Sequence, residues 1–183
     1  MQSQTLSKPD WAVLGQYVGA PPDPPSGIIA QSCELGMGLF ATRTFAPDET
    51  IFWFTGKMID SAEVKSRGIA AGYPLQVDED LFIDVGWPGL FVNHSCEPNA
   101  GLRDHRRLVA LRPIDIGEEI RFDYSTEISG HWWTLQCRCG ATNCRGQIAD
   151  FDQLPPEVQA ERLRQGIVQP YIVRLLSEKA TVA

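Results

Sequence analysis

The stretch Cys137-Arg138-Cys139-Gly140-Ala141-Thr142-Asn143-Cys144 places three cysteines within eight residues. A closed structural metal site takes four ligands in a tetrahedron, so three thiolates on one short loop need a fourth ligand from elsewhere. Cys96 is the upstream candidate, within Asn93-His94-Ser95-Cys96-Glu97-Pro98-Asn99. His131 and His105 are rival fourth ligands. If Cys96 is the ligand, the loop is pinned beside residues 93–99.

The cysteine count supports a metal site over disulfides. The chain has five cysteines, an odd number, and a reducing compartment also disfavours a disulfide framework. The alternative is a set of unrelated buried cysteines, since free cysteine is often a small core residue. A C-x-C-x4-C cluster is reactive when it is left reduced and exposed, which favours the metal. Cys33 is then a free thiol.

Bulk composition indicates one ordinary globular domain. The chain has 183 residues, of which 43% are hydrophobic and 21% are charged, so a buried core is expected and disorder is not. Residues 1–10 are polar and lack a signal-peptide core, and no apolar run is long enough to cross a membrane. We therefore expect a cytoplasmic protein, or a nuclear one if the host is eukaryotic.

The formal net charge of −7 bears on partners. It disfavours direct nucleic-acid binding, which needs a basic face. It suits a basic, lysine-rich protein or peptide as partner. The alternative is that mild acidity only aids solubility. The sequence sets no oligomeric state.

Short strands separated by turns dominate the chain, so the expected fold class is mainly β, of the α+β type. Strands are expected at Leu39–Thr44, Ile51–Phe54, Leu81–Val85, Leu108–Leu111 and Glu119–Phe122. A short helix is expected over Ser61–Arg67 with Ser61 as N-cap. Two further helices are expected near the end of the chain, one starting at Leu154–Glu157 and one over Pro170–Ser177. Apolar residues at helical spacing indicate that the last helix covers the domain: Val168, Ile172, Leu175 and Leu176.

Two further motifs stand out. Gly36-Met37-Gly38 precedes a predicted strand, where glycines permit close backbone approach or a positive φ. It is not a phosphate loop, because no Gly-Lys-Ser/Thr follows. Gly117-Glu118-Glu119-Ile120-Arg121-Phe122-Asp123-Tyr124 ends a strand at a tyrosine, which alone is usually a core residue with its hydroxyl at the rim.

Taken together and in this order, these motifs resemble those of the SET-domain family of protein lysine methyltransferases. Residues 36–41 are similar to its first cofactor motif, residues 93–99 to NHSCxPN, residues 117–124 to GEE…FDY, and residues 137–144 to the post-SET C-x-C-x4-C. The resemblance implies a SET-domain β-clip fold of small sheets with a pseudoknot that joins the second and third motifs. It divides the chain into an N-terminal extension with a proline-rich linker (1–27), a SET domain (28–127), a zinc-binding post-SET loop (128–150) and a C-terminal helical extension (151–183).

The resemblance also implies the ligands. S-adenosylmethionine would be bound by Gly36, Met37, Gly38, Asn93, His94 and Tyr124. One structural zinc ion would be held by Cys96, Cys137, Cys139 and Cys144. The target lysine would enter from the opposite face through a narrow channel.

The chemistry of methyl transfer agrees with this scheme. A sulfonium methyl needs in-line approach by a neutral amine, and holding both reactants in place lowers the barrier by up to about 7–11 kcal/mol. Lysine is mostly charged at neutral pH, so a desolvating apolar channel favours its neutral form. We expect Tyr124 to be catalytic, with its hydroxyl directed at the sulfonium and the amine. The expected channel walls are Phe54, Phe122, Trp132 and Trp133.

Two positions bear on what the enzyme makes. Phe122 stands where the family carries Phe or Tyr, and Phe leaves room in the amine pocket, so addition of more than one methyl is expected. Phe54 stands where the family often has Tyr, so a hydroxyl near the amine is missing. Two alternatives follow: a catalytically silent SET-like module that binds a basic peptide, and a methyltransferase for a small amine. The small size suggests a stand-alone enzyme, with a bacterial host.

Overall fold

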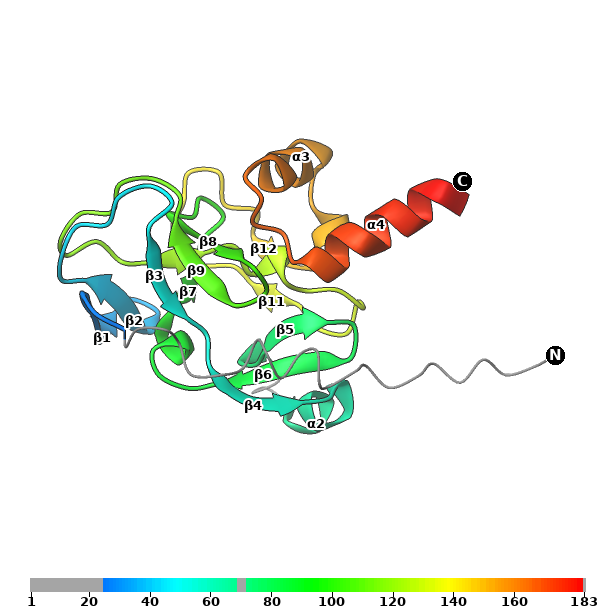
Figure 1. Ribbon diagram of the computed structural model, residues 1–183, viewed down its shortest axis with the longest axis horizontal. Helices are drawn as coiled ribbons and strands as arrows, with labels where there is room; N and C mark the ends of the chain where they lie inside the picture. The colour runs from blue at the N-terminus through cyan, green and yellow to red at the C-terminus, as the bar shows by residue number, and fades with distance from the viewer. Residues whose placement is uncertain (1–24, 69–71, 183) are drawn as a thin grey trace.

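The computed structural model describes residues 25–68 and 72–182, so most of the predicted N-terminal extension lies outside the described residues. Short strands follow one another along most of the described chain, and the helices α3 and α4 come at its C-terminal end (Figure 1). The strands are β1 Ile28–Cys33, β2 Gly36–Ala41, β3 Thr50–Trp53, β4 Gly56–Ile59, β5 Leu75–Asp78, β6 Leu81–Val85, β7 Asn93–His94, β8 Ala100–Arg103, β9 Arg107–Ala110, β10 Arg121–Phe122, β11 Leu135–Gln136 and β12 Gln147–Ile148. The helices are α2 Ser61–Ser66, α3 Pro156–Arg164 and α4 Pro170–Val182, with 3-10 turns η2 Gly89–Phe91, η3 Tyr124–Thr126 and η4 Phe151–Gln153.

The strands form several small sheets. β1 and β2 make an antiparallel hairpin, while β3-β9-β8 and β4-β6-β5 are three-stranded antiparallel sheets. β11 pairs with β12, and β10 pairs in parallel with β7. This arrangement confirms the predicted mainly β class built from small sheets.

Two predicted boundaries are corrected. The strand expected from Leu39 begins at Gly36, because residues 36–41 pair with β1 along their whole length. The N-cap of α2 is Asp60 rather than Ser61, since Asp60 Oδ1 accepts a hydrogen bond of 2.8 Å from Glu63 N. An N-cap side chain serves the second or third amide of the helix, and here the carboxylate does so while Ser61 is already helical.

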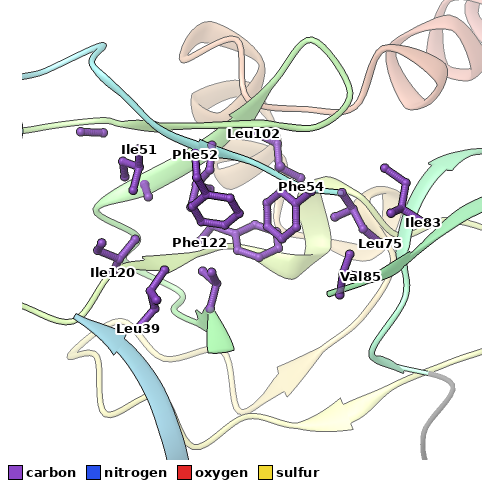
Figure 2. Close-up of a cluster of buried hydrophobic side chains, with 14 of the residues drawn as sticks. Leu39, Ile51, Phe52, Phe54, Leu75, Ile83, Val85, Leu102, Ile120 and Phe122 are labelled. Carbon is purple, nitrogen blue, oxygen red and sulfur yellow. The ribbon is translucent and has the colours of Figure 1, made fainter. Parts of the chain in front are cut away.

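A row of aromatic rings runs through the core toward the site. Phe52 in β3 and Phe54 just after it have ring centroids 4.9 Å apart, and Phe54 lies 5.9 Å from Phe122 in an edge-on contact. Figure 2 shows these three rings surrounded by buried aliphatic side chains. Burying one such side chain contributes roughly 1.5–3 kcal/mol. Tyr124 continues the row, 4.9 Å from Phe122, so the core fixes the position of the tyrosine ring.

The C-terminal helices are docked on the segment that follows Tyr124. Tyr171 in α4 donates its hydroxyl to the carbonyl oxygen of Glu127 at 2.6 Å. The amide of Gln169, just before α4, donates to the carbonyl oxygen of Thr126 at 2.9 Å. The apolar residues noted for their spacing pack with Phe151 and Leu154: Val168, Ile172, Leu175 and Leu176.

Candidate active site and metal centre

The parallel pairing of β7 with β10 assembles the site. Arg121 stands opposite Asn93, and Phe122 opposite His94. The backbone amide of Tyr124 then donates to His94 Nδ1 at 3.1 Å across a separation of 30 residues. The second and third sequence motifs therefore lie side by side, as the predicted junction requires.

A cavity of about 500 Å³ opens on one side of this junction. Three of the residues predicted to bind a cofactor line it: Asn93, His94 and Tyr124. Leu35 lines it as well, as do the strand residues Leu135 and Gln136 and the Cys137–Cys139 segment. The segment that carries Cys137 and Cys139 therefore forms one wall of this cavity.

Residues 36–38 are connected to this cavity through Asn93 and Glu119. They are not among the described residues that line it, but the carbonyl oxygen of Met37 accepts a hydrogen bond of 2.9 Å from Asn93 Nδ2. Gly36 has a φ of +107°, a conformation that favours glycine. A Cβ on Gly38 would overlap Glu119 Oε1. Gly38 therefore leaves room for a carboxylate.

That carboxylate, Glu119, orients Asn93. Glu119 Oε1 accepts from Asn93 Nδ2 at 2.7 Å, and Glu119 Oε2 pairs with the Arg121 guanidinium. Arg121 Nη1 in turn donates to the carbonyl oxygen of Cys139 at 2.9 Å. The glutamate was part of a quoted motif, but its contact with Asn93 depends on strands that are far apart in the sequence.

A second, narrower cavity of about 40 Å³ lies beside the first. Phe54 and Phe122, both predicted channel residues, line it together with Val92 and Glu127. Four residues line both cavities: Gly72, Tyr73, Leu90 and Tyr124. Tyr124 thus stands where the two cavities meet.

The two tryptophans predicted as channel walls, Trp132 and Trp133, are not among the described residues that line the smaller cavity. Trp133 lines the larger cavity, where its ring packs against Gly72. Trp132 lines neither of these two cavities within the described chain. Its ring packs edge-on against Phe82 at 5.7 Å, and its Nε1 donates to the carbonyl oxygen of Ser129 at 3.1 Å. A partly buried indole gains from a partner for its N–H, and this partner lies outside both cavities.

Tyr124 is held as a neutral phenol. Its hydroxyl donates to the carbonyl oxygen of Val92 at 2.6 Å, and its ring contacts His94 at 5.3 Å. Burial raises the pKa of Tyr124 well above its ordinary value, and the nearby Glu127 and Glu119 raise it further. At neutral pH the side chain is therefore a hydrogen-bond donor rather than a base.

The cysteines converge on the far side of His94. Cys96 and Cys137 are buried with their sulfur atoms 3.7 Å apart, too far for a disulfide of about 2.05 Å. Cys139 Sγ and His94 Nε2 complete a group whose ligand atoms lie within 4.8 Å of one another. Cys144 is more exposed, and its thiol approaches those of Cys137 and Cys139. A tetrahedron with metal–sulfur bonds of about 2.3 Å sets its sulfur atoms about 3.8 Å apart, which the Cys96–Cys137 pair matches.

His94 is better suited to donate to this cluster than to ligate a metal. Burial lowers the pKa of His94 to about 4, so the ring is neutral. Its Nδ1 accepts from the Tyr124 amide, so the proton resides on Nε2. Nε2 lies 3.3 Å from Cys96 Sγ. Nε2–H can therefore donate to the Cys96 sulfur, an outer contact of the kind that tunes metal ligands.

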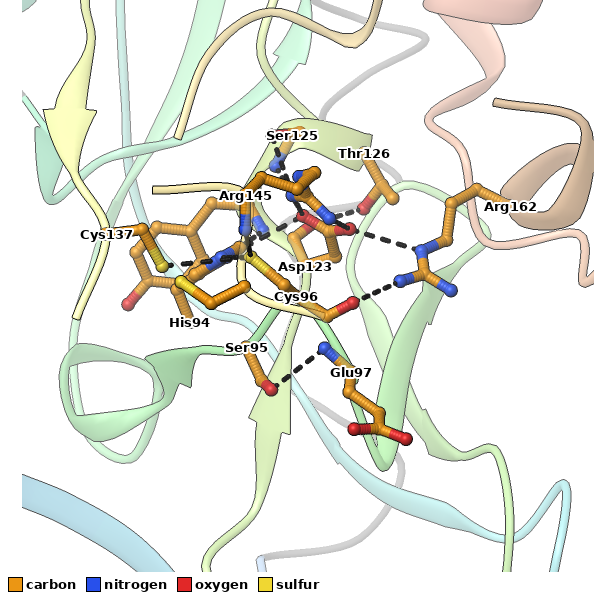
Figure 3. Close-up of polar contacts among 12 residues, drawn as sticks. His94, Ser95, Cys96, Glu97, Asp123, Ser125, Thr126, Cys137, Arg145 and Arg162 are labelled. Atoms are coloured by element: carbon orange, nitrogen blue, oxygen red, sulfur yellow. Dashed lines mark hydrogen bonds and ion pairs between the residues drawn. The ribbon is translucent and has the colours of Figure 1, made fainter. Parts of the chain in front are cut away.

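A buried ion-pair network lies beside the group formed by the cysteines and His94. Asp123 is fully buried and receives two hydrogen bonds from Arg145, at 2.6 and 3.0 Å, and one from Arg162 Nε at 3.1 Å (Figure 3). Figure 3 shows the three side chains meeting beside Cys96. Neither arginine was singled out from the sequence. The only local signal is that Arg145 directly follows the last cysteine of the cluster.

Comparisons with known proteins agree with this geometry. A family model described as "SET domain" matches residues 36–125. The chain is 31% identical over 164 residues to "Histone-lysine N-methyltransferase, H3 lysine-36 specific" of Mus musculus, and 33% identical over 137 residues to "Histone-lysine N-methyltransferase SETD1" of Drosophila melanogaster. It is 34% identical over 137 residues to "Histone-lysine N-methyltransferase, H3 lysine-4 specific" of Saccharomyces cerevisiae.

These alignments cover 80%, 66% and 65% of this chain, but 6%, 8% and 13% of the respective relatives. The chain therefore spans only a small part of their length. The relatives come from animals and a fungus, so they lend no support to the expected bacterial host. Among residues 25–68 and 72–182, every helix is too short or too polar to cross a bilayer.

Proposed function

This chain belongs to the SET-domain family, and from that premise we propose that it is an S-adenosylmethionine-dependent protein-lysine N-methyltransferase. The observation that carries the proposal is the meeting of two cavities at Tyr124. Methyl transfer between two substrates that enter from different sides needs such a junction, with one reactant on each side.

The larger cavity fits the cofactor. Asn93 presents its amide there, fixed by Met37 O and Glu119, and the cavity of about 500 Å³ is large enough for a nucleoside-sized ligand. The carbonyl oxygen of Met37 supports Asn93 directly, and Gly38 leaves room for Glu119 beside it. When bound, S-adenosylmethionine supplies the activated methyl group.

The narrow cavity fits the aliphatic stem of a lysine. Phe54 and Phe122 are buried and apolar, so they exclude water and favour the neutral amine. The Tyr124 hydroxyl, held by the Val92 carbonyl, orients the reacting groups at the junction. A basic protein is the proposed substrate, because the net charge is −7 and the relatives described above are named for lysines of histone H3.

We propose that one structural zinc ion is held by Cys96, Cys137, Cys139 and Cys144. The chemistry of the donor set supports this: the thiols of Cys96, Cys137 and Cys139 gather, and the thiol of Cys144 approaches two of them. The neutral His94 ring has its Nδ1 lone pair engaged. A closed site of four thiolates orders a loop without taking part in the reaction. Here that loop is a wall of the cofactor cavity, so the metal would couple folding of the loop to cofactor binding.

The test is transfer of labelled methyl from S-adenosylmethionine to histones and other basic proteins by the zinc-loaded protein. The Tyr124→Phe variant keeps the ring packing and removes the hydroxyl, and we expect it to lose at least about 10²-fold in rate. Ser177→Ala removes an exposed hydroxyl of α4 outside both cavities and serves as the control. Label found only on small amines would instead favour the small-amine enzyme. Tight cofactor binding with no transfer to any acceptor would favour the silent peptide-binding module.

A further inference from the structure

Glu127 is the acidic residue among the described side chains that line the narrow cavity, most of which are of apolar type. It follows η3 and lines the cavity beside Phe54, Phe122 and Tyr124, and only 6% of its surface is exposed. Its Oε2 accepts a hydrogen bond of 2.6 Å from Gln76 N. Its own amide and carbonyl groups are bonded to Tyr124 O and to the Tyr171 hydroxyl. The side chain is therefore held in place rather than free to swing into solvent.

This carboxyl group has no cation beside it. Within the described residues, Glu127 is not in the ion pairs formed by lysine, arginine or histidine. The phenols of Tyr124 and Tyr171 lie near it, and Tyr73 lines the same cavity. Burial raises the pKa of Glu127 to about 8, against the opposing effect of the Gln76 hydrogen bond. A buried carboxylate without a partner is costly. The cavity therefore favours a cationic or proton-donating guest.

We propose, on the basis of the methyltransferase function above, that Glu127 is a second catalytic residue, which binds the substrate ammonium in the narrow cavity and accepts a proton from it. Phe54 has no hydroxyl to contact the amine, and Glu127 supplies a polar contact in the same cavity. The ligand class is a primary or partly methylated alkylammonium at the end of an aliphatic stem.

The proton balance closes without another reactant. As the ammonium enters, its charge favours ionisation of Glu127, whose proton leaves to water. The ammonium then passes one proton to the Glu127 carboxylate, and the nitrogen lone pair forms the new N–C bond. The methyl–sulfur bond breaks with its electron pair on sulfur. The products are a methylammonium and a thioether, with one proton released to water per methyl.

The kinetic test is the variant Glu127→Gln, which preserves size and an acceptor for Gln76 N but cannot take a proton. In the wild type we expect kcat/KM to rise with pH toward about 8, because the carboxylate form is needed. In the variant, kcat/KM should no longer rise with pH in this range, and kcat near pH 8 should fall at least about 10-fold. Glu127→Asp should keep the rise of kcat/KM with pH, with lower values of kcat/KM throughout. Glu157→Gln, in the exposed first turn of α3, is the control and should match the wild type. An unchanged pH profile in Glu127→Gln would overturn the proposal.

A second measurement does not depend on turnover. The carboxyl carbon of Glu127, labelled with ¹³C, is followed by NMR through a pH titration of the zinc-loaded wild type, with and without n-butylammonium. We expect the free protein to titrate near pH 8 at this carbon and the amine-bound protein to titrate well below that. A titration that n-butylammonium leaves unmoved would refute the inference, even if the protein methylates lysine. Absence of methyl transfer with the shift present would refute the proposed function alone.

Discussion

Arg162, in the C-terminal helix α3, donates from Nη2 to the carbonyl oxygen of Cys96 at 2.8 Å. The same guanidinium donates from Nε to the buried carboxylate of Asp123. One side chain from a C-terminal helix thus holds both the backbone at Cys96 and the side chain of Asp123, which precedes Tyr124. The helical extension is therefore part of the support of the site.

Replacing Arg162 by Gln should destabilise the protein by about 3–5 kcal/mol, because Asp123 stays buried while losing one of its two arginines. Urea denaturation of the zinc-loaded protein measures the change. Arg164→Gln is the matched control, since Arg164 is exposed on the same helix, where it pairs with Glu161. It should cost less than about 0.5 kcal/mol. Equal effects of the two variants would show that the contacts of Arg162 do not support the fold.

Gly38→Ala should weaken cofactor binding. The new methyl group would overlap the Glu119 carboxylate, and moving Glu119 releases Asn93. We expect the dissociation constant for S-adenosylhomocysteine to rise at least about 10-fold, or ~1.4 kcal/mol, by calorimetry. Gly86→Ala is the control, because its Cβ would have only an ordinary contact at 3.9 Å. An unchanged dissociation constant in Gly38→Ala would show that the position of Glu119 does not matter for cofactor binding.

Cys137→Ser should abolish the bound zinc that we expect at about one ion per chain, since a closed site missing one thiolate binds far more weakly. Metal analysis after gel filtration gives the stoichiometry, and thermal unfolding should show a lower midpoint. Cys33→Ser should retain the full metal content, because Cys33 lies outside the group that gathers at His94. Zinc retained at full occupancy by Cys137→Ser would argue against this ligand set.

Glu127 should make stability depend on pH in a direction opposite to that of a salt-bridged carboxylate. Its pKa is raised from an ordinary value near 4.5 to about 8 in the folded protein, so the folded state holds the proton more tightly. The contribution of this protonated side chain to the free energy of unfolding is fully present below about pH 4.5, and it is lost as pH rises to about 8. The stability of Glu127→Gln relative to wild type should therefore increase over this window, by up to about 1.4 kcal/mol per pH unit. Denaturation curves for both proteins at matched pH values give this difference; a constant difference would contradict the shift.

Phe122→Tyr should restrict the product. The added hydroxyl would enter the narrow cavity beside Phe54, where it reduces the room for a methylated amine. We expect the wild type to form di- or trimethyl-lysine at long times, and the variant to stop at a lower state, as measured by mass spectrometry of the substrate. A wild type that makes only monomethyl-lysine would contradict the expectation from Phe122.

Much of this protein was predictable from short segments. The mainly β class follows from brief apolar strands between turns, and the cysteine cluster follows from a spacing of a few residues. The motif order was enough to indicate the family, which the family match over residues 36–125 confirms. These features are local, because backbone conformation and ligand spacing depend on neighbouring residues.

The contacts that cross the fold were decided only by the tertiary structure. Trp132 and Trp133 are adjacent in the chain, yet one packs on Phe82 and the other lines the larger cavity. Neither Glu127 nor Arg162 was singled out from the sequence, yet both are buried. Burial, and with it a shifted pKa or a buried ion pair, depends on which distant segments pack together. The spacing of residues along the chain does not reveal which distant segments pack together. The sequence therefore determined the family and its motifs, while the packing decided which charged residues lie at the site.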